Sequence, residues 1–294
     1  MVDSPAASAA PPDTTPGVRW PASLTLVRHG QSTGNLADAR ARARGAEVVD
    51  VGERDADVPL SELGRRQAAA VGAWLATAPE APPAPRVVLS SPYARALRTA
   101  EAVVRGAREA GLEVPDPRTD ERLRERDLGW WDGLTGAGVR ARFPEEAARR
   151  TRLGKFYYRP PGGESWCDVA LRVRSLLASL REEHAGQDVL VVSHQAVIMN
   201  FRLVLEDLDE RSLLELDASE PLANCSVTSY TSRGAGGGGV RLQVAGDTRA
   251  VADVRVTDDP ADDPADDPAD EGSPDGDPAR DGARGPAGVA GAAR

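Results

Sequence analysis

Leu24-Thr25-Leu26-Val27-Arg28-His29-Gly30 is the most informative run of the chain, because a mostly apolar segment ends abruptly there in an arginine, a histidine and a glycine. The apolar residues predict a buried strand, and the glycine permits a tight turn where another backbone or a ligand comes close. A second histidine, His194, follows the similar run 189–193. Because open α/β sheets build their sites at the carboxyl ends of strands, we expect both histidines in one site.

Short apolar runs alternate with longer amphipathic runs from about residue 20 to about residue 250. This alternation predicts a single three-layer α/β domain, with a mostly parallel central sheet and helices on both faces. The runs predict strands at 23–27, 86–90, 189–193, 226–232 and 240–244, and helices starting at Ser32 and spanning 63–77, 92–111, 165–183 and 196–205. The segments 37–57 and 120–133 are polar or irregular and are expected to be loops.

Both ends of the chain differ in composition from this domain. Residues 1–19 are rich in Ala, Pro, Ser and Thr and predict a disordered leader, since they lack the basic start and apolar stretch of a signal peptide. Residues 251–294 predict an acidic disordered tail. Ten Asp and one Glu against three Arg give residues 258–294 a net charge of −8, out of −10 for the 294-residue chain. The acidity therefore belongs mainly to the tail.

Several classes of protein are disfavoured by composition. No basic stripe with interleaved aromatic residues is present, so we expect no nucleic-acid partner. No apolar run approaches about 18 residues, so we expect no membrane span. Cys167 and Cys225 lie far apart without Cys-x-x-Cys spacing, which is typical of two buried thiols in a reducing cytoplasm. The oligomeric state is left open.

The residues at the predicted strand ends suit phosphoryl chemistry. A neutral imidazole can attack phosphorus, and arginines bind phosphoryl oxygens through two hydrogen bonds at once. Arg28 adjoins His29, while Arg95 and Arg98 lie on the next predicted strand-to-helix connection. A carboxylic acid is needed to protonate the leaving oxygen. Composition and spacing leave four candidates for this acid, namely Asp120, Glu121, Glu125 and Asp127.

Four segments resemble, in the same order, the motifs of the histidine phosphatase superfamily, which has the phosphoglycerate mutase-like fold. They are Arg28–Asn35 (RHGQSTGN), Ser90–Ala100 (SSPYARALRTA), Leu123–Arg126 with the following Gly129, Trp130, Asp132 and Gly133, and Ser193–Val197 (SHQAV). The resemblance implies that His29 is the nucleophile and Glu125 the general acid. It implies that Arg28, Arg95 and His194 hold the phosphoryl group and that Asn35 lines the same pocket. Arg98 falls outside the family's phosphate position, and no metal or other cofactor is implied.

The superfamily contains both phosphatases and mutases. Other residues indicate which of its branches this chain resembles. Gln195 follows the second histidine, as in fructose-2,6-bisphosphatase-like members, whereas mutases usually have glycine there, and we expect Gln195 to bind substrate. The segment Tyr158–Ser165 resembles the substrate segment of that branch, which would place Arg159 in the leaving-group pocket. However, the bisphosphatases carry a lysine at the position of Gly162.

We therefore expect a phosphatase acting on small phosphate monoesters. A phosphoglycerate mutase-like isomerase and a non-catalytic protein that binds phosphorylated ligands remain as alternatives.

Overall fold

The apolar run that opens the domain forms the strand β1, Ser23–Arg28, whose six residues are all buried. In the computed structural model, which describes residues 20–234 and 239–257, β1 lies inside a six-stranded sheet of order β3-β2-β4-β1-β5-β6. The other strands are β2 (Val87–Ser90), β3 (Arg118–Thr119), β4 (Asp188–Ser193), β5 (Val227–Ser232) and β6 (Val240–Asp247). Among these six strands, β5 alone runs against the rest, so the sheet is mostly parallel as predicted.

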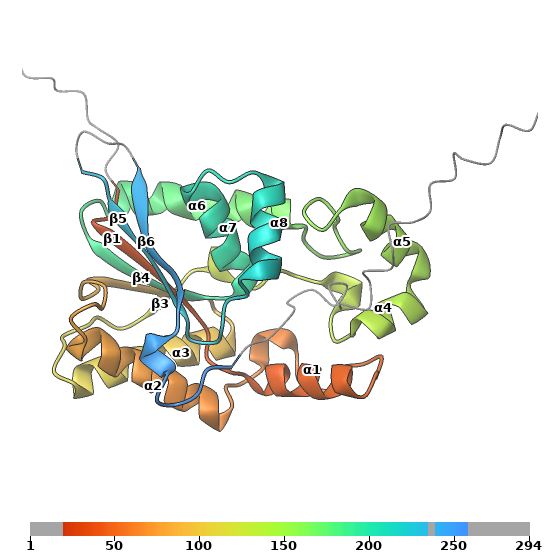
Figure 1. Ribbon diagram of the computed structural model, residues 1–294, viewed down its shortest axis with the longest axis horizontal. Helices are drawn as coiled ribbons and strands as arrows, with labels where there is room; N and C mark the ends of the chain where they lie inside the picture. The colour runs from red at the N-terminus through yellow and green to blue at the C-terminus, as the bar shows by residue number, and fades with distance from the viewer. Residues whose placement is uncertain (1–19, 235–238, 258–294) are drawn as a thin grey trace, which may run out of the picture.

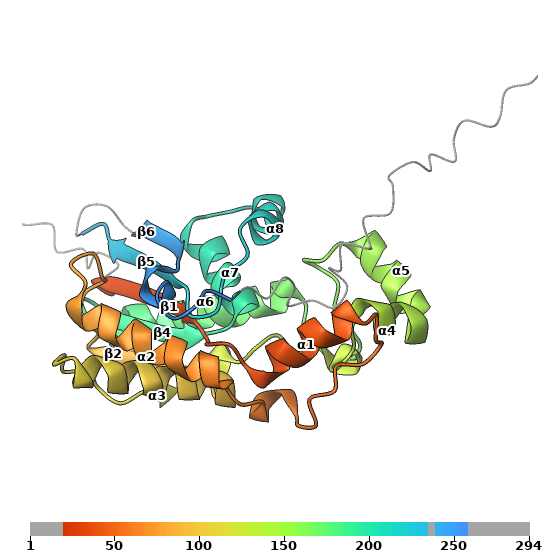
Figure 2. The same cartoon turned by 60° about the horizontal axis from the view of Figure 1, so that its bottom comes forward.

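Helices cover both faces of this sheet. The α-helices of the described residues are α1 (Thr33–Ala43), α2 (Glu62–Thr77), α3 (Ala94–Glu109), α4 (Gly136–Arg142), α5 (Pro144–Leu153), α6 (Trp166–Glu183), α7 (Gln195–Leu205) and α8 (Glu210–Ser219). α2 and α3 lie on one face, and α6 and α7 on the other (Figure 1). α1, α4 and α5 lie beyond one end of the sheet in both views (Figure 2). The predicted three-layer α/β architecture is confirmed.

Successive residues of the central strands pack into different layers. Leu26 and Val191 belong to the core shared with α6 and α7, whereas Val27 and Val192 belong to the core shared with α2 and α3. A strand that is covered on both faces favours apolar residues on both sides, which explains why these runs are mostly apolar and do not alternate, with Thr25 as a buried polar exception in β1.

The sequence located the strands and helices of the central layers to within three residues at their ends. It missed β3, α4, α5 and α8. β3 has two residues, and α5 has no buried residue, so neither produces an apolar repeat. Together α4 and α5 flank a small separate core that includes Trp131 and Tyr158.

The packed domain extends beyond residue 250. Val251 is fully buried, and the Thr257 carbonyl accepts a hydrogen bond from the Asn224 backbone at 2.9 Å. Residues 251–257, which the sequence assigns to the tail, therefore contact the domain. The predicted leader 1–19 and the remaining tail residues 258–294 lie outside the described residues. Within the described part of the chain, no helix has the length and apolar character needed to cross a membrane.

Candidate active site

His29 directly follows β1, and a hydrogen bond fixes the orientation of its imidazole ring. Its Nδ1 lies 2.9 Å from the Gly30 carbonyl oxygen. A carbonyl only accepts, so Nδ1 carries the proton and the Nε2 lone pair is left for chemistry. Burial lowers the pKa of His29 well below its ordinary value, and the positive charges of Arg95 and Arg28 lower it further. The imidazole is therefore neutral, which is the form that a nucleophile requires.

Close backbone packing fixes the turn after His29. A Cβ on Gly30 would lie 2.6 Å from the Gly64 carbonyl oxygen, at the start of α2. The Gly30 N–H also donates to the Thr99 hydroxyl on α3 at 3.0 Å. The glycine in the opening motif therefore permits a close approach between the β1 turn and α2.

His194 lies opposite His29, as the pairing of their strands requires. Arg28 and Ser193 are partners in the register of β1 and β4, so the next residue of each strand emerges at the same edge. The two imidazole centroids are 5.1 Å apart. The Nε2 of His194 is 2.8 Å from the Ser91 hydroxyl. Burial, Arg95 and His29 lower the pKa of His194 well below its ordinary value, so this ring is neutral too.

Glu125 is the candidate acid that lies beside His194. Its Oε2 is 3.4 Å from Nδ1 of His194, and the side chain is mostly buried. Of the other candidates for the acid, Asp120 is paired with Arg122, Glu121 is exposed, and Asp127 lines the outer cavity. Geometry thus selects Glu125 among alternatives that the spacing left open.

A charged clamp holds the segment that carries Glu125. The Glu164 carboxylate accepts hydrogen bonds from the Arg124 and Arg172 guanidinium groups and from the Asp127 backbone N–H. Arg172, on α6, also donates to the Arg122 carbonyl at 2.7 Å. The irregular segment is therefore fastened to α6 along its length, which fixes the position of Glu125.

The three arginines near the predicted strand ends, Arg28, Arg95 and Arg98, lie in different environments. The Arg95 guanidinium is buried and is bound by both carboxylate oxygens of Asp55. Arg28 is fully buried and donates to the Leu222 carbonyl. Arg98 is exposed and pairs with Glu101, in agreement with its exclusion from the site.

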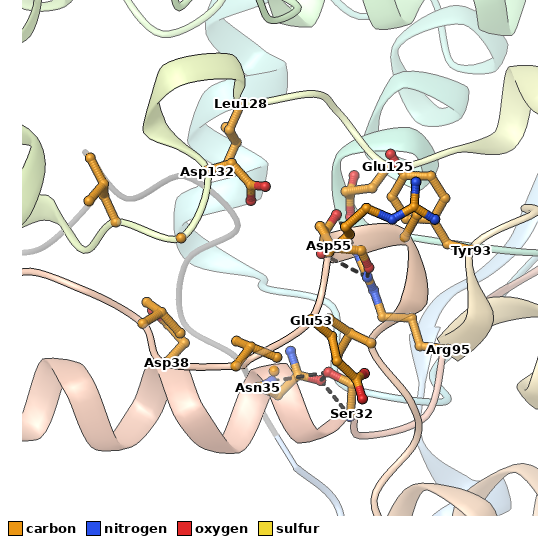
Figure 3. Close-up of a pocket in the computed structure, with 18 of the residues that line it drawn as sticks. Ser32, Asn35, Asp38, Glu53, Asp55, Tyr93, Arg95, Glu125, Leu128 and Asp132 are labelled. Carbon is orange, nitrogen blue, oxygen red and sulfur yellow. Dashed lines mark hydrogen bonds and ion pairs between the residues drawn. The ribbon is translucent and has the colours of Figure 1, made fainter.

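A cavity of about 840 Å³ opens in front of His29. Its walls include Glu125, Arg95, Tyr93 and residues 48–56 of the loop after α1. Figure 3 shows Asp55 pointing toward Arg95, with Tyr93 and Glu125 beside them. Away from His29, the cavity walls are rich in carboxylates, among them Asp38, Asp50, Glu53, Asp127 and Asp132. Burial and the nearby Asp55 raise the pKa of Asp132.

The remaining predicted substrate-binding residues are not all brought to this cavity. Asn35 lines it and also caps α1, because its side-chain oxygen accepts from the Ser32 backbone N–H at 2.8 Å. Gln195 is buried outside the cavity wall, where its amide donates to Asp217 at 3.1 Å. Arg159 is exposed, pairs with Asp168, and does not line the cavity. Of these three residues, only Asn35 lines the cavity together with His29.

Three residues of the site were not singled out from the sequence. Ser91 and Tyr93 belong to the second motif, so their closeness to Arg95 in the chain was the available signal. Tyr93 lies 5.5 Å from the His194 ring, measured between centroids, and burial raises its pKa to about 12. Asp55 gave no signal, because it lies in a polar segment with many other charges.

No metal or other cofactor was expected at this site. In the described residues, no group of three or more His, Cys, Asp or Glu side chains is arranged to hold a metal ion. The charges that face His29 come from arginines instead.

The sequence and structure match known proteins over most of the domain. The family model described as "Histidine phosphatase superfamily (branch 1)" matches residues 24–245. A 2,3-bisphosphoglycerate-dependent phosphoglycerate mutase of Gloeobacter violaceus is 35% identical over 199 residues, which cover 67% of this chain and 80% of that protein. A 6-phosphofructo-2-kinase/fructose-2,6-bisphosphatase of Caenorhabditis elegans is 34% identical over 198 residues, which cover 67% of this chain and 36% of that protein.

A solved structure leads to the same family. The complex of mycobacterial glucosyl-3-phosphoglycerate phosphatase with inorganic phosphate has a TM-score of 0.57 at 30% identity. The match covers 77% of this chain and 98% of that chain. Since the family model spans most of the domain and the fold agrees, this chain belongs to the histidine phosphatase superfamily.

Proposed function

We propose that this protein is a phosphatase that hydrolyses small phosphate monoesters through a phosphohistidine at His29, without a metal ion. Two features of the site support this function. His29 is neutral and its Nε2 lone pair is available, and Glu125 lies beside the second histidine, His194. A nucleophile and a proton donor that line one cavity are the two parts that the reaction needs.

In the first step, Nε2 of His29 forms a bond to phosphorus while the bond from phosphorus to the ester oxygen breaks. Glu125, in its protonated form, gives its proton to that oxygen, and the alcohol leaves. Arg28, Arg95 and His194 bind the phosphoryl oxygens, where preorganised donors contribute about 3–4 kcal/mol each to transition-state binding. Asn35 contacts the same group from the cavity wall.

In the second step, water attacks phosphorus and the N–P bond breaks. Glu125 is now a carboxylate and takes a proton from the water, so inorganic phosphate forms and His29 is regenerated with its lone pair. Both residues thus return to their starting protonation states.

The cavity walls favour hydrolysis of a monoester over reactions that require a second phosphate. Carboxylates outnumber arginines among the lining side chains, so a second anionic group would meet net negative charge. Arg42 is paired with Asp38 on the same wall at 2.7 Å. A mutase remains the second candidate, because the relative from Gloeobacter violaceus is a phosphoglycerate mutase.

The first test is phosphate release from p-nitrophenyl phosphate, with EDTA present, by the wild-type protein and by His29→Ala. We expect release by the wild type and at least a thousandfold loss in the variant, because no other side chain can replace the nucleophile. Loss of wild-type activity on chelation would contradict the metal-independent mechanism. Transfer of phosphate between positions of phosphoglycerate without net release would favour the mutase.

A second variant tests the assignment of the acid. Glu125→Gln keeps the size of the side chain but cannot exchange the proton, so we expect kcat to fall about 10²- to 10⁴-fold. Binding of inorganic phosphate, measured by calorimetry, should change far less. Asp127→Asn is the matched control, because Asp127 lines the cavity but does not contact His194. If Glu125→Gln turns over substrate at the wild-type rate, Glu125 is not the acid. If the wild-type protein binds inorganic phosphate but releases none from esters, the result favours a non-catalytic binding protein.

A further inference from the structure

The guanidinium that the proposed reaction needs is already bound to a carboxylate of the protein. Nη1 of Arg95 donates to Oδ1 of Asp55 at 2.8 Å and to the Asp55 carbonyl at 2.7 Å, and Nη2 donates to Oδ2 at 3.2 Å. This two-point geometry is the one that arginine offers to a phosphoryl group. Burial would lower the pKa of Arg95, but the charges of Asp55 and Glu125 raise it, so Asp55 contributes to holding the buried charge.

Asp55 sits on a loop whose ends are fastened and whose middle is exposed. Toward the N-terminal end, the Val49 N–H donates to the Gly133 carbonyl at 2.8 Å. Toward the other end, Val58 is buried and the Pro59 carbonyl accepts from the Thr33 N–H at 2.9 Å. Residues 52–54 between these anchors are exposed, and Asp55 itself is partly exposed. The Asp55 side chain, which is 39% exposed, therefore already borders solvent, while both ends of the loop are held.

An ester and Asp55 compete for the same donors. A phosphoryl group that approaches His29 brings up to two negative charges, and the Asp55 carboxylate beside it would repel them if it stayed. Once the phosphoryl oxygens replace Asp55 on Arg95, the carboxylate can return to water.

We propose that Asp55 is a specificity-determining residue: its carboxylate occupies Arg95, and only an ester whose leaving group also binds the cavity displaces it efficiently. The inference rests on the proposed function of this site. It predicts that inorganic phosphate and small aryl esters bind weakly to the wild-type protein, because they gain little from the rest of the cavity. Weak binding of inorganic phosphate also limits inhibition by product.

The test compares Asp55→Asn with Asp57→Asn. Asp57 lies on the same short turn and loses the same charge, but it pairs with the exposed Arg54 and does not line the cavity. Calorimetric titration with inorganic phosphate should give about tenfold tighter binding to Asp55→Asn, as expected for removal of one charged competitor. Asp57→Asn should stay within about twofold of the wild type.

Turnover gives a second measurement of the same effect. The KM for p-nitrophenyl phosphate should fall in Asp55→Asn by about the same factor, while kcat changes little. Equal effects of the two variants would mean a long-range charge effect and would overturn the proposal. Weaker phosphate binding to Asp55→Asn would show that Asp55 positions Arg95 instead of competing for it. Phosphate binding does not depend on turnover. The calorimetric comparison therefore tests the role of Asp55 even if the experiment with His29→Ala contradicts the proposed phosphatase activity.

Discussion

At the scale of single residues, the site consists of two neutral histidines held among positive charges. His29 and His194 are buried, and their rings are edge-on at 5.1 Å. Two charged imidazoles at this distance, next to Arg95, would repel one another strongly. The protein thus places its positive charge on the arginines and keeps both imidazoles neutral.

The low pKa values of His29 and His194 predict how stability depends on pH. Below the ordinary histidine pKa of about 6.5, the unfolded chain binds protons at these positions and the folded chain does not. The free energy of unfolding should therefore fall as the pH falls, by about 1.4 kcal/mol per pH unit for each histidine.

Urea unfolding at about pH 7, 6 and 5 measures this dependence, since ordinary carboxylates titrate lower, near pH 4. The double variant His29→Asn with His194→Asn is the control and should show a shallower slope. If its slope equals that of the wild type over this range, the two histidines are not neutral in the folded protein.

At the scale of elements, the turn after β1 and the start of α2 are packed backbone against backbone. Ser61 caps α2 by accepting a hydrogen bond from the Gly64 N–H at 3.0 Å. A Cβ on Gly64 would lie 2.0 Å from the Gln31 carbonyl oxygen. Any side chain at this position would push the turn that carries His29 away from α2.

Gly64→Ala should therefore destabilise the protein, although alanine is the better helix former by about 1 kcal/mol. We expect a loss of more than about 2 kcal/mol in the free energy of unfolding, measured with urea. Ala73→Gly, at an exposed position of the same helix, is the matched control and should lose about 1 kcal/mol. A stabilised Gly64→Ala protein would mean that the turn relaxes at little cost.

The sequence predicted those elements whose residues are buried on a regular repeat, and it failed where burial is sparse. The run 189–193 was recognised because both faces of β4 are covered. α5 has no buried residue, so its pattern resembles that of a loop. The same reason explains which site residues could be predicted. His29 and His194 directly follow strands with clear apolar runs, whereas the pairing of Asp55 with Arg95 depends on the path of a loop that has no repeating pattern.

At the scale of the whole molecule, residues 251–257 connect elements that are far apart in the sequence through hydrogen bonds. The Gln67 amide on α2 donates to the Arg255 carbonyl at 2.8 Å and to the Thr257 hydroxyl at 2.9 Å. Thr257 in turn donates to the Asn224 side chain, whose amide donates to the His29 carbonyl at 3.2 Å. Residues 251–257 thus stabilise the backbone beneath the site.

Two shortened proteins test this role. A chain that ends after residue 257 keeps these contacts, and a chain that ends after residue 250 loses them together with the buried Val251. Burial of one valine contributes about 1.5–3 kcal/mol and each hydrogen bond about 1 kcal/mol. The shorter chain should therefore unfold at least about 5 °C lower in calorimetry. Equal melting temperatures would show that the segment contributes nothing to stability.

The order of strands has a consequence for synthesis of the protein. Both sheet neighbours of β1 come from the last third of the domain, because β1 pairs with β4 and β5. At roughly 5–20 residues per second, the ribosome needs on the order of 10–30 s to proceed from Arg28 to Asp188. During that time the apolar first strand of a nascent chain has neither of its partners. Folding of the sheet, and with it the first appearance of a complete site, must therefore wait until most of the domain has left the ribosome.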